Sequence, residues 1–277
     1  MVPKFERVGF IEKIVKKALM PLLSVRAIGN FFFVKLSNVG QKIKAAAATY
    51  RALEMIYTYS WKSTQGEKFW DRLFTHILLN FTNAKAVRNR LLFVKQEIKE
   101  AISSFEKDEV HIMSLGSGSA RAIIEALSEA PNSDKRYTAT LVDRNSDALA
   151  YSQRLAEEKG VLEKIAVEKG LLEEFVRNGH NHPPDIIEMV GIMDYLSEAT
   201  VVKIIRETRR LLSPGGIFIT CNISDNSERT FLERVLGWKM IYRRPEDLCR
   251  ILTKAGFEQP KIITEPLGIH IIAIGKK

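Results

Sequence analysis

A strand-like segment that runs into a glycine-rich turn is the feature that most constrains this fold. Val110–Leu115 is a short apolar run, and Gly116-Ser-Gly-Ser119 follows it just before a predicted helix. Glycine has no Cβ atom, so Gly116 and Gly118 can take left-handed angles and let backbone N–H groups approach a ligand closely. The pattern is typical of the first strand, turn and helix of a nucleotide-type cofactor site in an open α/β sheet.

The next predicted strand, Thr138–Val142, leads into a carboxylate, Asp143. A carboxylate at this place can accept two hydrogen bonds from a ribose diol. The alternative is that Asp143 caps the following helix, although Asn145 and Ser146 could do that themselves. A dinucleotide site would want a small residue three places after the second glycine, where Arg121 stands instead. The spacing therefore argues against a dinucleotide.

From about residue 106 the chain alternates between predicted strands and helices, as expected of a mostly parallel sheet. Further strands are predicted at Ile165–Glu168, Asp185–Gly191, Ile217–Cys221, Lys261–Thr264 and Ile269–Gly275, and helices at Arg121–Glu129, Ser146–Lys159, Leu171–Val176 and Thr200–Leu212. We therefore expect an α/β domain over residues 106–277, preceded by an all-helical region over residues 1–105.

Several features of the α/β domain resemble the class I S-adenosylmethionine-dependent methyltransferases. They are the G-x-G-x-A turn with Asp143 after it, the L-x-P-G-G turn at residues 212–216, and the closing helix and two strands after Arg244. Within that superfamily, the segments Arg88–Arg90, Ser114–Arg121 and Tyr242-Arg243 are similar to a family described as "putative methyltransferase". The resemblance implies a Rossmann-like sheet of seven strands, mostly parallel, with a terminal antiparallel hairpin. It also implies S-adenosyl-L-methionine as the cofactor.

The resemblance also implies which residues bind the cofactor. Gly116, Ser117, Gly118 and Ser119 would receive the methionine end, Asp143 and Arg144 the ribose, Gly170 and Leu171 the adenine, and Gly191 and Ile192 the methylsulfonium. The chain departs from the family at Ser114, where an acidic residue often helps to hold the methionine ammonium. That departure leaves the partner of the ammonium unidentified.

Asp194 and Tyr195 follow the fourth predicted strand and are the candidate catalytic residues. Asp194 could orient or deprotonate a nucleophile. The alternative is a helix-capping aspartate beside a half-buried tyrosine. His180 and His182 lie two residues apart without a third ligand of zinc spacing, so we expect no metal.

The helical region carries the positive charge of the chain. Residues 1–105 contain 18 Lys and Arg against 7 Asp and Glu, whereas residues 106–277 are nearly neutral. Helices are predicted at about 8–20, 43–59, 68–80 and 83–105, and we expect them to form a lid or substrate region. The charge points to an anionic substrate or partner, or only to solvated helix faces.

The segment 8–20 has the periodicity of an amphipathic helix that Pro21 would end. Its apolar face would hold Ile11, Ile14, Val15, Ala18 and Leu19, and its other face Lys13, Lys16 and Lys17. Such a helix could contact a membrane surface peripherally, as could the run Phe31–Phe33. The alternative for both is packing into the protein's own core.

These features favour a methyltransferase that acts on a small-molecule or lipid-like acceptor. One alternative is an RNA methyltransferase, whose phosphate-tracking face would be formed by Lys42, Lys44, Arg88, Arg90, Lys95 and Lys99. Another is a catalytically silent scaffold with the same fold. Cys221 and Cys249 offer no disulfide framework, which favours a cytoplasmic setting. The sequence leaves the oligomeric state and the acceptor open.

Overall fold

A computed structural model of the chain describes residues 4–130, 135–172, 175 and 182–277. The chain divides into two compact units by its internal contacts. A helical unit contains Met1–Arg90, Ser224–Met240 and Glu265–His270, and a sheet unit contains Leu91–Ile223, Ile241–Thr264 and Ile271–Lys277.

The sheet has seven strands in the order β3-β2-β1-β4-β5-β7-β6. Their bounds are β1 Glu109–Leu115, β2 Arg136–Asp143, β3 Ile165–Lys169, β4 Ile186–Met189, β5 Ile217–Ile223, β6 Lys261–Thr264 and β7 His270–Lys276. The pairs β1–β2, β2–β3, β1–β4 and β4–β5 are parallel, and β6 pairs with β7 in antiparallel fashion. The predicted mostly parallel sheet with a terminal hairpin is confirmed.

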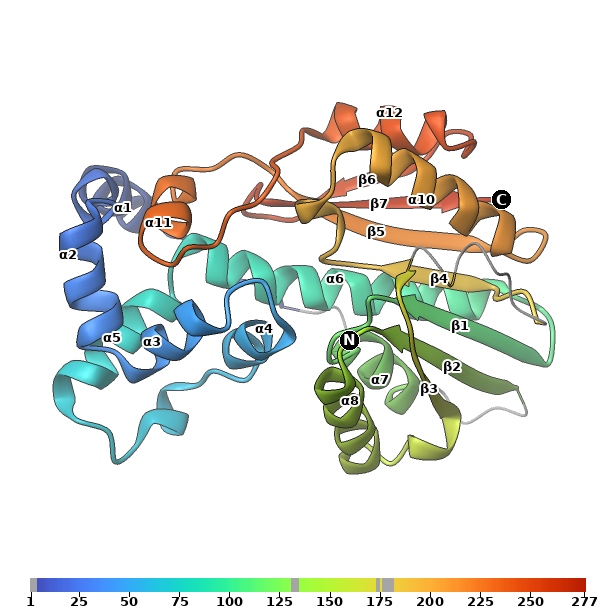
Figure 1. The fold of residues 1–277 in the computed structure, drawn as a ribbon, viewed down its shortest axis with the longest axis horizontal. Coiled ribbons are helices and arrows are strands. Elements are labelled where there is room, and N and C mark those ends of the chain that lie inside the picture. The colour runs from blue at the N-terminus through green and yellow to red at the C-terminus, as the bar shows by residue number, and fades with distance from the viewer. Residues whose placement is uncertain (1–3, 131–134, 173–174, 176–181) are drawn as a thin grey trace. The chain divides into compact units, whose positions relative to one another are not determined.

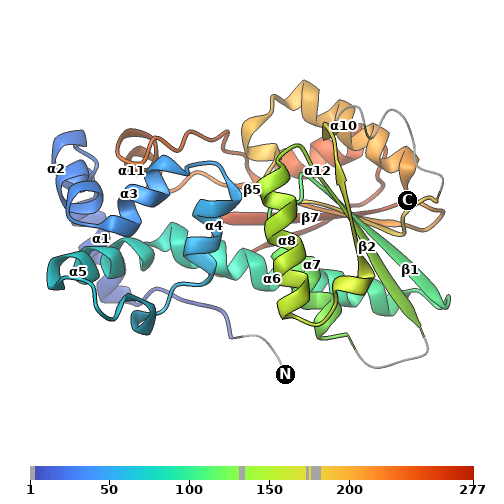
Figure 2. The same ribbon diagram turned by 60° about the horizontal axis from the view of Figure 1, so that its bottom comes forward.

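Helices cover both faces of the sheet (Figures 1 and 2). On one face, apolar side chains of α7 Arg121–Ser128, α8 Ser146–Glu158 and the later turns of α6 Thr82–Ser104 form one core with the strands. On the other face, α10 Glu198–Leu211 and α12 Pro245–Lys254 form a second core. Because both faces are covered, the central strands are buried along nearly their whole length.

The order of the strands reverses between β1 and β4, which both pair in parallel and so end at the same edge of the sheet. In an open parallel sheet, such a reversal leaves a crevice outside the carboxyl ends of the strands, because the connections leave in opposite directions. The predicted cofactor turn follows β1, so the topology places it at this switch point.

The helical unit is built from short helices. They are α1 Phe10–Leu23, α2 Arg26–Asn30, the π-helix η1 Phe31–Lys35, α3 Asn38–Ala45, α4 Tyr50–Tyr57, the 3₁₀-helix η2 Trp61–Thr64, α5 Phe69–Leu79, the first turns of α6, and α11 Arg229–Arg234. Phe33, Phe81 and Phe231 form an aromatic cluster at its centre, with ring centroids 5.1–5.4 Å apart. Phe33 is thus a core residue, whereas Phe31 is half exposed.

Within the described part of the chain, no helix is by itself long and apolar enough to cross a bilayer. The segments Glu12–Leu23 and Arg26–Lys35, bent by 103° relative to each other, pass that test of length and composition only as a pair.

Two predicted helices have other bounds in the structure. The helix expected over 43–59 is broken between α3 and α4, where Ala48 takes a left-handed φ of 62° despite the helix propensity of alanine. The helix α1 continues through Pro21 to Leu23, since a proline so near the end removes few hydrogen bonds. Of the helix expected at 171–176, only residues 171, 172 and 175 are described.

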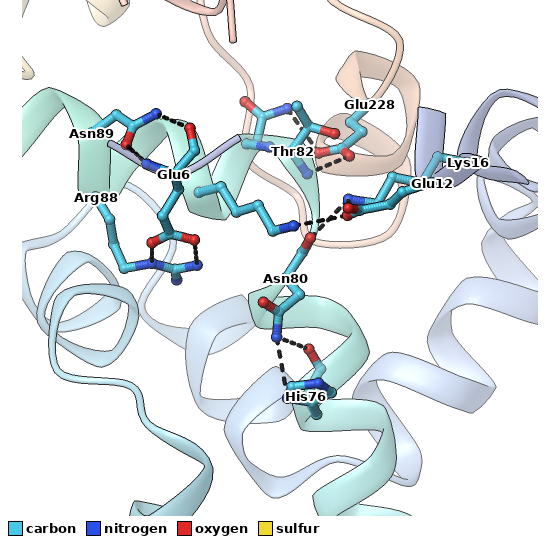
Figure 3. Close-up of polar contacts among 11 residues, drawn as sticks. Glu6, Glu12, Lys16, His76, Asn80, Thr82, Arg88, Asn89 and Glu228 are labelled. Carbon is cyan, nitrogen blue, oxygen red and sulfur yellow. Dashed lines mark hydrogen bonds and ion pairs between the residues drawn. The ribbon is translucent and has the colours of Figure 1, made fainter. Parts of the chain in front are cut away.

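The two compact units divide at a different place from the boundary predicted at residue 105. The division falls within α6, between Arg90 and Leu91, and residues 224–240 belong with the N-terminal helices. A physical reason is the carboxylate of Glu228, which accepts hydrogen bonds from the backbone N–H groups of Thr82 (2.7 Å) and Asn83 (2.8 Å) at the start of α6 (Figure 3). These N–H groups have no partner within the helix, so the distant carboxylate serves as their cap.

Candidate functional site

The glycine turn after β1 has the backbone conformation that the sequence predicts. Gly116 and Gly118 have positive φ values of 68° and 55°. The N–H groups of Gly116 and Ser117 both donate to the carbonyl of Val142, at 2.9 and 3.0 Å, which fixes the turn to the end of β2. No side chain caps the start of α7 after the turn. An anionic group could therefore bind at that helix terminus.

Asp143 connects the glycine turn to the second strand. Its Oδ2 accepts the Gly118 N–H and its Oδ1 accepts the Asn145 N–H, both at 2.8 Å. Asn145 is the N-cap of α8, so the capping role considered for Asp143 belongs to its neighbour. The Gly170 N–H donates to the Asp143 carbonyl at 3.2 Å, which brings the predicted ribose and adenine positions together. Each carboxylate oxygen has a second lone pair for a further donor.

The loop after β4 approaches the glycine turn closely. A Cβ atom at Gly116 would lie only 2.5 Å from Cδ1 of Ile192, so a side chain there would have to displace that of Ile192. Gly191 has a φ of 84° and open space around its Cα. Gly116 and Ile192, predicted separately, are therefore neighbours in the structure.

The other predicted cofactor residues differ in exposure. Ser119 is buried, and the Oγ of Ser117 is buried with no hydrogen-bond partner among the described residues. Arg144 is exposed and Leu171 is 45% exposed. Glu173, which follows Leu171 by two positions in the sequence, is outside the described residues.

Glu188 is a candidate that the sequence analysis missed. It lies on β4 directly opposite Ser114 of β1, and the Ser114 hydroxyl donates to its Oε2. The side chain is only 8% exposed. A carboxylate therefore lies beside the position where the related enzymes often have one, but it comes from the neighbouring strand. The sequence does show Glu188 as an acidic residue within an otherwise apolar strand. That it faces Ser114, however, depends on the register between β1 and β4, which the sequence does not give.

Asp194 is held by backbone groups. It lies in the 3₁₀-helix η4 Met193–Tyr195 and is 3% exposed. Its Oδ1 accepts the Ile223 N–H at 2.8 Å, and its carbonyl accepts the Ile241 N–H at 2.7 Å. These bonds favour the structural alternative for Asp194 over proton transfer, although its contact with β5 differs from the helix cap expected. Tyr195 is 39% exposed.

The buried side chain of Arg243 holds the loop that contains Asp194. It is 6% exposed, and it donates to the carbonyls of Met193 (2.7 Å) and Leu196 (2.6 Å) and to Oδ1 of Asn222 (2.6 Å). Burial lowers the pKa of its guanidinium, against the opposing effect of Asp194 and other acids. Three acceptors within the protein therefore surround the guanidinium of Arg243, which is a buried structural residue.

The cations proposed as an RNA-binding face are mostly engaged within the protein. Arg88 pairs with Glu6 (Figure 3), Lys95 with Glu125 and Glu129, and Lys99 with Glu129. The partners of the remaining members include Asn30 for Lys44 and the Tyr57 hydroxyl for the buried Arg90. Pairing of this kind reduces the charge available to phosphates.

Among the described residues, no three His, Cys, Asp or Glu side chains are grouped so that they could hold a metal ion. Of the two histidines considered, His180 lies outside the described residues.

Comparisons with known proteins bear on the fold and on the family. A possible exported protein of Bordetella parapertussis has a similar structure, with a TM-score of 0.75, 14% identity and coverage of 95% of this chain and 94% of that one. Magnesium protoporphyrin IX methyltransferase of Synechocystis, with bound SAH, has a TM-score of 0.56 and 12% identity, and the match covers 78% of this chain and 92% of that one. Mitomycin 7-O-methyltransferase has a TM-score of 0.53 and 13% identity, with coverage of 86% of this chain and 67% of that one. At these identities the likeness shows the fold. No curated protein matches the chain.

The family comparison covers most of the sequence. Residues 38–277 match the family described as "Putative methyltransferase". That range includes the whole sheet, the glycine turn, Asp143 and Glu188. The chain therefore belongs to this methyltransferase family.

Proposed function

We propose that this protein transfers a methyl group from S-adenosyl-L-methionine to a small-molecule or lipid-like acceptor. The observation that carries the proposal is the arrangement at the carboxyl edge of β1, β2 and β4. There the glycine turn is bonded to Asp143, and Ser114 is bonded to Glu188. One edge of the sheet thus combines backbone N–H groups with two carboxylates at the switch point.

The residues present fit this cofactor. The uncapped start of α7 favours a ligand carboxylate, such as that of methionine. The buried Ser117 Oγ has no partner among the described residues, so a polar ligand group would satisfy it. Asp143 retains lone pairs for the ribose hydroxyls.

We assign to Glu188 the role of ammonium partner that Ser114 does not fill. A buried carboxylate is stabilised by a cationic donor, and the methionine ammonium carries three N–H donors. The Ser114 hydroxyl already orients Oε2 of Glu188. The ammonium would therefore meet a carboxylate whose direction is set before binding.

Alignment accounts for most of what the protein contributes to the reaction. The bound cofactor supplies a methyl group on a positively charged sulfur, which is a good electrophile without further activation. Gly191 and Ile192 would wall the methyl position, and the loop that contains them is fixed by Arg243. Asp194 and Tyr195 remain the predicted polar residues near the acceptor, Asp194 in an orienting role because Ile223 already binds its carboxylate.

The proposed acceptor class is supported by the acceptors of structurally similar enzymes. The structurally similar enzymes named above act, by their names, on a porphyrin and on mitomycin, which are both small molecules. We propose that the helices within residues 1–105 form the acceptor-binding lid.

Calorimetric titration with S-adenosylhomocysteine tests the cofactor assignment. We expect binding by the native protein and a loss of about 1–2 kcal/mol for Asp143→Ala, the usual effect of losing charge-assisted hydrogen bonds. Glu157→Ala removes an exposed carboxylate of α8 and serves as the control. No binding by the native protein would favour a silent scaffold, and unchanged affinity of Asp143→Ala would remove its ribose role.

Methyl-labelled S-adenosylmethionine then tests the acceptor class. The protein is incubated with separate extracts of small metabolites, lipids and RNA, and the labelled fraction is identified by mass spectrometry. We expect label in the metabolite or lipid fraction. Label confined to RNA would contradict the proposal.

A further inference from the structure

The first helix of the chain turns its apolar side outward. Six large apolar side chains along α1 and just after it are 47–78% exposed: Phe10, Ile14, Val15, Leu19, Leu22 and Val25. Three of these, Ile14, Val15 and Leu19, were predicted to lie on the apolar face of the helix, and a helix in a globular protein normally buries such a stripe. A contiguous exposed apolar surface marks a binding face.

Polar contacts on the opposite side fix this orientation. Glu12 accepts from Lys85 at 2.8 Å, and Lys16 donates to the Asn80 carbonyl at 2.7 Å and pairs with Glu12 at 2.6 Å (Figure 3). Met20, on the same side, is 3% exposed. Burial raises the pKa of Glu12, but the bonds from Lys16 and Lys85 outweigh it and lower the pKa overall. The outward face is therefore held by specific bonds.

A cationic cleft lies beside the end of this helix. It has a volume of about 380 Å³. Lys17 and Arg234 line it together with the hydroxyl residues Ser24, Ser227 and Thr230, and none of the described residues that line it is acidic. Ser24 is 4% exposed, and its Oγ has no hydrogen-bond partner among the described residues. Two cations and a buried unsatisfied hydroxyl suit a phosphate group.

We propose that α1 and this cleft bind the surface of a bilayer that contains anionic phospholipids. The exposed apolar side chains would enter the boundary between headgroups and acyl chains, as amphipathic interfacial helices do. Lys17, Arg234 and the Ser24 hydroxyl would bind a headgroup phosphate. Lys13 and Arg26, both exposed, add positive charge beside the apolar stripe.

Charge decides between a lipid surface and a protein partner as the occupant. The apolar stripe is flanked by lysines, and the adjoining cleft has cations without acidic neighbours in its lining. A headgroup layer presents phosphates next to hydrocarbon, which is the complementary arrangement. The whole of α1 precedes residue 38, where the family match begins. The inference uses no residue assigned to the cofactor site, so its failure would leave the proposed methyl transfer intact.

Vesicle flotation of the full-length protein tests the proposal. We expect binding to vesicles of phosphatidylcholine with about one-third phosphatidylglycerol, weak binding to phosphatidylcholine alone, and release as salt is raised. The triple variant Phe10→Ser, Ile14→Ser, Leu22→Ser should lose binding. The pair Lys17→Ala, Arg234→Ala should bind roughly 30-fold more weakly, since each cation near an anionic surface contributes about tenfold or somewhat less.

Matched variants elsewhere in the helical unit serve as controls. Phe69→Ser with Trp70→Ser removes two other exposed apolar side chains, and Lys62→Ala with Lys68→Ala removes two other exposed cations. Both should bind like the native protein, and all variants should keep the native circular dichroism spectrum because the changed residues are exposed.

Three results would overturn the proposal. Full binding by the α1 triple variant would exclude the helix as the attachment face. Equal loss in the Lys62 and Lys68 control would mean that general charge, and not the cleft, binds the headgroups. A native dimer that the triple variant dissociates, with no vesicle binding by either, would identify a second copy of the chain as the occupant.

Discussion

The carboxylates at the carboxyl edge of the sheet differ from one buried histidine of the helical unit in how their polar atoms are bonded. At the sheet edge, Asp143, Glu188 and Asp194 each accept a backbone or hydroxyl donor. In the helical unit, both ring nitrogens of the fully buried His270 lack a hydrogen-bond partner among the described residues. The first arrangement fixes the direction of the carboxylates, whereas the second leaves a base whose protonation opposes folding.

A substitution in the glycine turn at the sheet edge should have the largest effect of those considered. Gly118→Val places a β-branched side chain at a φ of 55°, which such residues avoid, and disturbs the N–H that Asp143 accepts. We expect the affinity for S-adenosylhomocysteine to fall by roughly 3–4 kcal/mol, measured by calorimetry. Gly160→Val, also at a positive φ but at the end of α8, is the control and should keep binding.

Arg243 tests whether the sheet edge depends on its buried support. Arg243→Met keeps the length of the side chain but leaves the carbonyls of Met193 and Leu196 and the amide of Asn222 without their donor. We expect the free energy of unfolding to fall by about 3 kcal/mol, measured by urea denaturation. The exposed Arg244→Met should change it by less than about 0.5 kcal/mol. Equal stability of the two variants would contradict a structural role for Arg243.

A substitution of Glu188 tests which part of the ligand the sheet edge would bind, the amino-acid part or the adenosine part. Glu188→Gln keeps the shape of the side chain but removes its charge, so we expect a loss of about 2 kcal/mol in binding of S-adenosylhomocysteine. Methylthioadenosine, which lacks the amino-acid part, should bind the variant and the native protein equally. An equal loss for both ligands would mean that Glu188 supports the site without contacting an ammonium.

His270 offers the smallest effect and concerns the helical unit. Burial, and to a lesser extent Arg90, lowers the pKa of His270 well below its usual value. The unfolded chain therefore takes up the proton first as the pH falls, so stability that is complete above about pH 6.5 declines below it. Urea denaturation should show a loss of about 1 kcal/mol per pH unit between about 6 and 5. His270→Leu should flatten this dependence, and the exposed His182→Leu should not.

The sheet could be predicted from the sequence because its signals are local. The central parallel strands β1, β4 and β5 are short and mostly apolar, and the glycine turn with Asp143 at fixed spacing marks the edge of the sheet that we propose binds the cofactor. The positions of Gly116, Gly118 and Asp143 required only the order of elements. For these residues, local pattern and global fold agree.

What escaped prediction depends on contacts that periodicity does not encode. Glu188 faces Ser114 through the register of β1 with β4. The pattern of α1 gives an amphipathic helix but does not say which side faces the protein. The bond that Lys16 donates to the Asn80 carbonyl and the bond that Glu12 accepts from Lys85 decide that. The capping of α6 by Glu228 joins positions that are 145 residues apart in sequence.

The polypeptide chain crosses between the two compact units five times, after Arg90, Ile223, Met240, Thr264 and His270. No single cut therefore releases either unit, and a fragment over 106–277 would lack the α6 side chains that complete the core under the sheet. Such interleaving means that neither half can be exchanged as a cassette between relatives. A redesign of either unit therefore has to be made by substitution within the full chain.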